Sequence, residues 1–171
     1  MCNTETQDAV PLLLGCASPD EYHALEDKSR ENSRLSADLC TIGKNKTFVR
    51  GLLEFPLRLG EGESLPSSSP ATLTWSVWVE VARTDFDRVV AGWNDETALT
   101  IEGTLANRLP LYDKIPGSSV TLATRPHRLR PLLRVTKSAN EDFLRHARDG
   151  IEIQRLSEIL LAMYKECSSE S

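Results

Sequence analysis

The segment 125–134, RPHRLRPLLR, is the densest group of side chains in the chain that could bind a charged ligand. Its candidate binding residues are Arg125, His127, Arg128 and Arg130. A guanidinium group binds a carboxylate or a phosphate through paired donors, and the two prolines constrain the backbone that carries these arginines. The segment therefore indicates a site for an anion or for an acidic partner.

The distribution of charge around this segment leaves two interpretations open. Between Lys114 and Lys137 there are six basic residues and no acidic residue, although the net charge of the whole chain is −5. Either the segment attracts an acidic partner, or its arginines pair with the chain's own carboxylates. Nucleic acid is disfavoured as a partner, because the body is acidic and no aromatic side chains alternate with the arginines to stack on bases.

A second candidate site lies on a strand that reads LTWSVWVEV, residues 73–81. Alternation places Trp78 on its polar face, beside Ser76 and Glu80. If the strand that contains Arg50 is its neighbour, Arg50 could make a cation–π contact with Trp78 or an ion pair with Glu80. The alternative is a polar binding site on the sheet surface. Trp78 itself is either core, covered by the helix 84–93 or by the C-terminal helix, or a half-exposed anchor for a partner.

A search for catalytic patterns finds none that identifies an enzyme. The sequence has no GxSxG motif and no HExxH motif, and the three histidines, His23, His127 and His146, lie in unrelated segments. A pair of catalytic carboxylates stays open, because separation in space cannot be read from sequence. We therefore name no catalytic residue, no metal ligand and no cofactor, and the chain is more readily interpreted as a non-enzyme.

The elements that must position these residues are predicted from hydrophobic periodicity and turn residues. The predicted fold is α+β, with a mainly antiparallel sheet of about five to six strands and helices packed on it. Ser18, Thr84 and Ser138 are the expected N-caps. The expected strands are 37–42, 47–57, 73–81, 98–110, 120–126 and 129–135, and the expected helices are 18–27, 84–93, 138–148 and 152–166.

We expect one domain, residues 18–167, between an irregular lead-in (1–17) and a C-terminal tail (168–171). No apolar run approaches the roughly 20 residues that span a membrane. The LLLGC stretch ending at Cys16 looks like a lipoprotein signal, but basic residues before it are missing and its apolar part is short. The four cysteines show no CxxC spacing, so reduced thiols and a cytoplasmic location are expected.

Several stretches together resemble a bacterial family known as domain of unknown function 2199. They are SPDEYHAL, LSADLCTIGKNKTFVRGLLEFPL, WSVWVEV, FDRVVAGW, GTLANRLPLY, VTLATRPHRLRPLLRV and DGIEIQRLSEI, which run from about residue 10 to 159. The resemblance implies a bacterial, cytoplasmic protein and implies no activity. Members often begin with a Cys-x-x-Cys-Gly stretch and a nearby histidine, typical of a zinc knuckle. Only Cys2 stands in that region here, so the resemblance transfers no metal.

Three functional hypotheses follow from the sequence. The first is a non-catalytic interaction domain, immunity-type or regulatory, that binds another protein through a sheet surface or the arginine-rich segment. The second is an enzyme or a small-ligand binder with a pocket between sheet and helices, lined by Arg50, Trp78, Tyr112 and Arg130. The third is a degenerate zinc protein. A homo-oligomer is compatible with all three.

Overall fold

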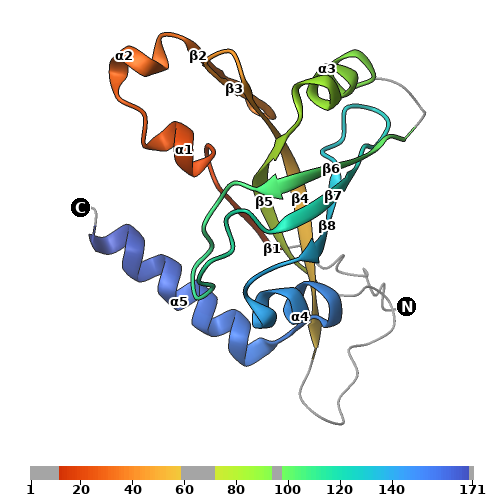
Figure 1. Ribbon diagram of the computed structural model, residues 1–171. Coiled ribbons are helices and arrows are strands. Elements are labelled where there is room, and N and C mark those ends of the chain that lie inside the picture. Colours follow the sequence, from red (N-terminus) through yellow and green to blue (C-terminus); the bar gives the residue numbers. More distant parts are fainter. Residues whose placement is uncertain (1–11, 59–71, 94–97, 170–171) are drawn as a thin grey trace, which may run out of the picture.

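The computed structural model describes residues 12–58, 72–93 and 98–169, and these form an α+β structure (Figure 1). Cys2 and residues 59–71 lie outside the described residues. The strands are β1 (Leu12–Gly15), β2 (Ser33–Leu35), β3 (Leu39–Ile42), β4 (Lys46–Arg58), β5 (Thr72–Val81), β6 (Thr100–Leu105), β7 (Ser119–Ala123), β8 (Leu132–Lys137) and β9 (Ile151–Glu152). The helices are α1 (Asp20–His23), α2 (Asp27–Arg30), α3 (Arg83–Ala91), α4 (Glu141–Asp149) and α5 (Ile153–Ser169).

Five of the strands, β4 to β8, close into a small barrel. The order β5-β6-β7-β8-β4 is completed by a direct β4–β5 pairing. The α+β class is confirmed. The sheet is mixed, because β1–β5, β4–β8 and β4–β9 are parallel pairs. It is also larger than the five to six strands expected, since nine strands pair within the described ranges. Periodicity tells which face of a strand is apolar and says nothing of strand direction, so the closure was not predictable from it.

The side chains on one face of each barrel strand fill the interior. At Gly51 and Gly103 no room remains for a side chain. A Cβ atom on Gly51 would lie 2.6 Å from Cδ2 of Leu133, and one on Gly103 would lie 2.5 Å from Cγ1 of Val79. These glycines face the interior at positions where neighbouring strands send in branched side chains. Their lack of a side chain allows a barrel of only five strands to close around a packed core.

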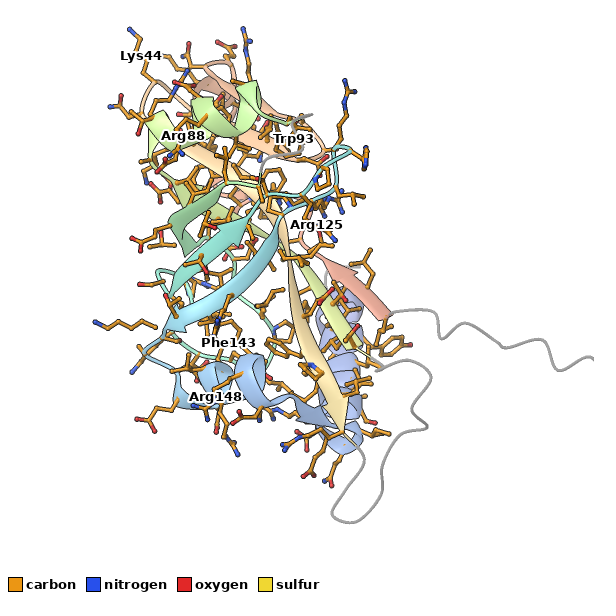
Figure 2. All side chains as sticks on the ribbon, turned by 90° about the vertical axis from the view of Figure 1, so that its right-hand side faces the viewer. Lys44, Arg88, Trp93, Arg125, Phe143 and Arg148 are labelled. Atoms are coloured by element: carbon orange, nitrogen blue, oxygen red, sulfur yellow. The ribbon has the colours of Figure 1, made fainter. Side chains whose placement is uncertain are left out.

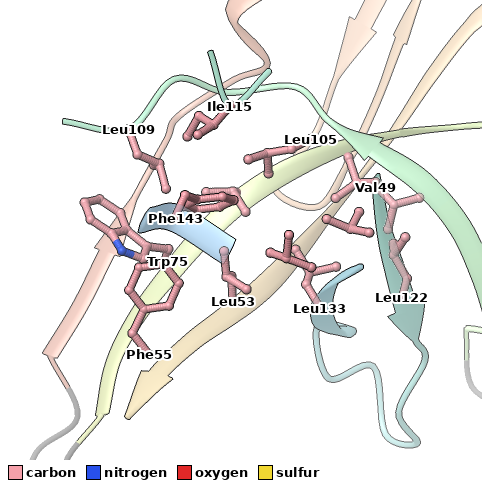
Figure 3. Close-up of a cluster of buried hydrophobic side chains, with 14 of the residues drawn as sticks. Val49, Leu53, Phe55, Trp75, Leu105, Leu109, Ile115, Leu122, Leu133 and Phe143 are labelled. Carbon is pink, nitrogen blue, oxygen red and sulfur yellow. The ribbon is translucent and has the colours of Figure 1, made fainter. Parts of the chain in front are cut away.

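Helices close the two ends of the barrel. Phe86 and Val89 of α3 join the core at one end. At the other end, Phe143 of α4 packs among aromatic side chains, with its ring centroid 5.9 Å from that of Phe55 (Figure 3). Ile159 of α5 is fully buried in the same cluster. None of the helices in the described ranges is long and apolar enough to cross a membrane.

Several helix starts differ from the sequence-based expectation. Helix α3 begins after Ala82, without a side-chain cap, so Thr84 is not its N-cap. Helix α4 is capped by Asn140, whose side-chain oxygen accepts from the Phe143 N–H at 2.8 Å. Ser138 instead accepts from the N–H of Asn140, which orients that cap. The first helix is a single turn that follows Pro19, and Ser18 does not cap it.

The lead-in is not irregular throughout. Leu12–Gly15 forms β1, which pairs in parallel with β5 in the register Leu12 to Leu73. A strand of four residues is too short for a recognisable alternation, and its partner lies far along the chain. The sheet extends to β1 on one side and to the β2–β3 hairpin on the other.

Replacing Gly51 with alanine should destabilise the barrel by about 1–3 kcal/mol, because the added methyl group meets the Leu133 side chain. Chemical denaturation measures the loss of unfolding free energy. In the double variant Gly51→Ala, Leu133→Ala the clash is gone, so the combined loss should be smaller than the sum of the two single losses. Additive losses would contradict the packing described for these two residues.

Candidate binding groove

Trp78 is a buried residue of a second, smaller core on the outside of the barrel. Its exposed fraction is 0%, and it packs with Cys40 and Phe48. The indole N–H donates to the carbonyl of Cys16 at 3.1 Å. The cover comes from Cys16 and Tyr22 of the segment after β1, together with Ile42 and Ala106, and no described side chain of α3 or α5 belongs to it. Of the two expectations for Trp78, core is confirmed, but the predicted covering helices were wrong.

Arg50 lies over the Trp78 ring, which is one of the arrangements that the sequence left open. The two residues are direct partners in the β4–β5 register, and the guanidinium carbon lies 5.6 Å from the indole centroid. Nη1 of Arg50 donates to the carbonyl of Ala37 at 3.2 Å. Burial lowers the pKa of Arg50, and the charge of Arg130 lowers it further. Arg50 thus connects the barrel wall to the turn between β2 and β3.

Arg130 holds the same turn. Its Nε donates to the Asp38 carboxylate at 2.6 Å, and its Nη1 donates to the Ser76 hydroxyl at 3.2 Å. Nε of Arg125 in turn donates to the Arg130 carbonyl at 2.7 Å. For Arg130, pairing with the chain's own carboxylate is therefore the observed arrangement. Arg50 and Arg130 together position the turn Ser36–Asp38.

This turn forms one wall of a groove between the β2–β3 hairpin and helix α3. The groove consists of two adjoining cavities of about 490 and 850 Å³, both lined by Ser36, Leu39 and Val90. Its floor includes exposed apolar side chains, since Leu35 and Val90 have exposed fractions of 39% and 46%. Figure 2 shows Arg88 and Trp93 at this end of the molecule and Phe143 and Arg148 at the opposite end. The remaining lining residues are Ser33, Arg34, Ala37, Asp38, Thr41, Arg83, Phe86, Trp93 and Arg128.

The arginine loop, residues 125–130, reaches this groove through Arg128. His127 and Arg128 both have a φ of 58°, the left-handed region that residues other than glycine rarely adopt. Two consecutive residues in this conformation carry strain, which surrounding contacts must offset. His127, Arg128 and Leu129 are exposed at the tip of the loop. The loop thus presents the basic side chain of Arg128 at the groove.

Strand β2 borders the groove and is an edge strand. It is the last strand in the sheet order and pairs, among the described strands, with β3 alone. Its outer edge therefore carries backbone N–H and C=O groups that a further strand could bind. The sequence reasoning missed both β2 and the groove, because strand β2 has only three residues and the cavities depend on how α3 sits beside the hairpin.

Tyr112 lies apart from the other predicted site residues. Its exposed fraction is 4%, and its ring packs 5.4 Å from that of Phe143 in the main core. Its hydroxyl lies 2.9 Å from Nδ1 of His146. The structure therefore brings Arg50, Trp78 and Arg130 together around one turn, with Arg125 and Arg128 nearby, and places Tyr112 with His146 on another part of the molecule.

The family model described as an uncharacterized protein conserved in bacteria (DUF2199) matches residues 1–151. The chain belongs to this family. The groove and the arginine loop lie within the matched part, whereas helix α5 lies beyond it. No curated protein and no solved structure matches the chain.

Two thiols of this DUF2199 domain flank Trp78, and both are poor nucleophiles. Burial raises the pKa of Cys16 to about 11, with a further increase from Asp20 and an opposing effect of Arg50. Burial also raises the pKa of Cys40 to about 11, and Glu21 contributes to the increase. At neutral pH both thiols are protonated, so these cysteines do not supply a reactive thiolate. Within the described ranges, no three His, Cys, Asp or Glu side chains are grouped to hold a metal ion.

Trp78→Ala should lower the free energy of unfolding by about 3–5 kcal/mol, because a fully buried indole leaves a cavity. Leu161→Ala is the matched control on an exposed apolar residue, and its effect should stay within about 0.5 kcal/mol. Denaturant titration followed by circular dichroism measures both losses. Equal, small losses would contradict the second core.

Cys16 and Cys40 should resist alkylation in the native domain. With pKa values near 11, their thiolate fraction at mildly alkaline pH is about a hundredfold below that of an ordinary thiol. The rate of iodoacetamide labelling, measured in a Cys2→Ser, Cys167→Ser background, should be at least that much slower than in denaturant. Labelling at the same rate in both conditions would show that these thiols are not buried.

Proposed function

We propose that this member of the DUF2199 family is a non-catalytic interaction domain whose groove binds an extended, acidic segment of another protein. The observation that carries the proposal is the combination of an apolar floor and a basic rim in one groove. Leu35 and Val90 expose apolar surface there, and apolar surface left open at the centre of a concave site favours an anchoring side chain of a partner.

The charges around the groove favour an acidic partner. The lining includes three arginines, Arg34, Arg83 and Arg128, and one carboxylate, Asp38. Asp38 is engaged by Arg130 within the protein. Arg83 also pairs with Asp87 at 3.1 Å, but both side chains are more than half exposed, and such a pair exchanges partners at little cost. A partner carboxylate at the rim therefore gains guanidinium contacts and adds specificity.

The edge of β2 supports an extended conformation of the bound segment. A peptide that adds as a strand satisfies the outer N–H and C=O groups of Ser33–Leu35, and its alternate side chains point toward and away from the groove. The short strand limits this pairing to a few residues. Affinity then depends on the apolar anchor and on the arginines as well as on backbone hydrogen bonds.

The predicted binding residues divide into two roles under this proposal. His127 and Arg128, at the tip of the arginine loop, contact the partner directly. Three other predicted residues stabilise the groove without touching the partner. They are Arg50, Trp78 and Arg130, whose contacts hold the turn that forms the groove wall. A wall fixed before binding reduces the ordering cost of association. An immunity-type or regulatory role remains our hypothesis for the kind of partner, which would be another protein of the bacterial cell.

Selection from a displayed peptide library on the full chain tests the proposed function. Enriched peptides should combine several acidic residues with one large apolar residue. Val90→Asp places a charge on the groove floor and should weaken their binding by at least about tenfold, measured by fluorescence anisotropy. The same replacement at the exposed Leu111, at the other end of the molecule, is the matched control and should leave affinity unchanged.

Three results would contradict the proposal. They are enrichment of basic peptides, equal loss of affinity in the Val90→Asp and Leu111→Asp variants, and unchanged affinity in both. Folding of each variant is checked by its thermal unfolding, since both positions are solvent-exposed and neither change should abolish the native state.

A further inference from the structure

A separate cavity of about 350 Å³ lies at the opposite end of the molecule from the groove, where β4, α4 and α5 meet. The chain turns sharply there at Gly150, which has a φ of 88°. A Cβ atom at this position would lie 2.3 Å from the Pro56 carbonyl oxygen, so only glycine allows so close an approach to β4. This turn brings one face of α4 and the first residues of α5 to one cavity.

Four potentially cationic side chains from these three elements line the cavity. Arg58 ends β4, Arg145 and His146 come from α4, and Arg155 comes from the first turn of α5. The lining also contains three carboxylates, Asp142, Glu152 and Glu158. Two of them are engaged by arginines, because Arg145 bonds Asp142 at 2.6 Å and Arg155 bonds Glu158 at 2.8 Å.

The donors at this cavity are only partly satisfied within the protein. Nε of Arg155 is buried and makes no hydrogen bond to any described residue, and the Arg155 guanidinium carbon lies 5.4 Å from the centroid of the Tyr112 ring. Nδ1 of His146 bonds the hydroxyl of Tyr112 at 2.9 Å, which fixes the ring. The other ring nitrogen of His146, Nε2, is not used in that contact. The first turn of α5 contains no acidic residue, although Glu152, which directly precedes the helix, also lines the cavity.

The local electrostatic field at His146 is positive. Burial lowers the pKa of this histidine, and the charges of Arg145, Arg155 and Arg58 lower it further. Only the charge of Asp142 opposes the three arginines. An imidazole disfavoured in its charged form by nearby cations marks a place where an anion would be stabilised.

We infer that this cavity binds the phosphate group of a small phosphorylated organic molecule, held by Arg58, Arg145 and His146. Guanidinium groups suit phosphate because their donors match its oxygen geometry. The volume lies within the range of small-molecule sites and exceeds what a phosphate group alone would fill. Phosphate binding at this position also recruits His146, because a neighbouring dianion favours the protonated ring.

Calorimetric titration of the full chain with phenyl phosphate at constant ionic strength tests this site. The double variant Arg58→Gln, Arg145→Gln should raise the dissociation constant by at least about tenfold. Arg148→Gln is the matched control, because Arg148 lies on the same helix, bonds Asp149 and does not line the cavity. Its dissociation constant should stay within about twofold of the unchanged chain.

Nuclear magnetic resonance of the His146 side chain provides the second readout. Saturating phenyl phosphate should raise the pKa of His146, whereas the resonances of His23 and His127, which do not line the cavity, should not move when the ligand is added. Absence of binding, equal losses in the two variants, or an unmoved His146 resonance would overturn the assignment. Inorganic phosphate that binds as tightly as phenyl phosphate would overturn the assignment to an organic phosphate.

Discussion

Strand β4 is the constraint on which the rest of the structure depends, because one strand serves as neighbour to four others. One of its edges pairs with β5 over ten positions, from Thr47 to Pro56. Its other edge pairs in turn with β3, with β8 at Leu52–Leu53 and with β9 at Leu57–Arg58. The middle pairing closes the barrel, and the outer two attach the hairpin at one end and the α4–α5 region at the other. Both candidate sites are therefore positioned by opposite ends of the same strand.

One face of β4 packs inside the barrel, and the other face supports the wall of the groove. On the face toward the barrel, Gly51 leaves space that the Leu133 side chain fills. The interior is therefore tightly packed, and a larger residue at position 51 would destabilise it. On the outer face, Arg50 lies against the buried Trp78 and bonds the turn that forms the groove wall. Arg50 is partly buried, and a guanidinium withdrawn from water is costly unless its charge and donors are engaged. The contact with Trp78 offsets part of the cost for the charge, and the hydrogen bond to the Ala37 carbonyl engages one of the donors. Through these two contacts the packing of the sheet determines the position of the groove wall.

Local features of the sequence predicted local features of the fold. Strands 37–42 and 47–57 were expected from hydrophobic periodicity and turn residues, and β3 and β4 lie there. The face assignment allowed a contact between Arg50 and Trp78, and the β4–β5 pairing makes the two residues direct neighbours. The pairing of Arg130 with Asp38 depends on closure of the barrel, which brings together residues far apart in sequence, so no local pattern indicated it. The cover of Trp78 was also assigned to the wrong elements, because Cys16, which lies against it, is 62 residues away in the sequence. Helix α3 has an apolar stripe, but Phe86 and Val89 fill the end of the barrel instead.

The central claim is that a preformed groove beside β2 binds an extended segment of another protein. Backbone hydrogen exchange of the full chain, with and without a bound acidic peptide, tests it most directly, because strand addition protects amides at the edge that receives the strand. The account predicts slower exchange in Ser33–Leu35 and in α3 when the peptide is bound, with α4 and α5 unchanged. Protection confined to α4 and α5, or unchanged exchange along β2 at saturating peptide, would contradict it.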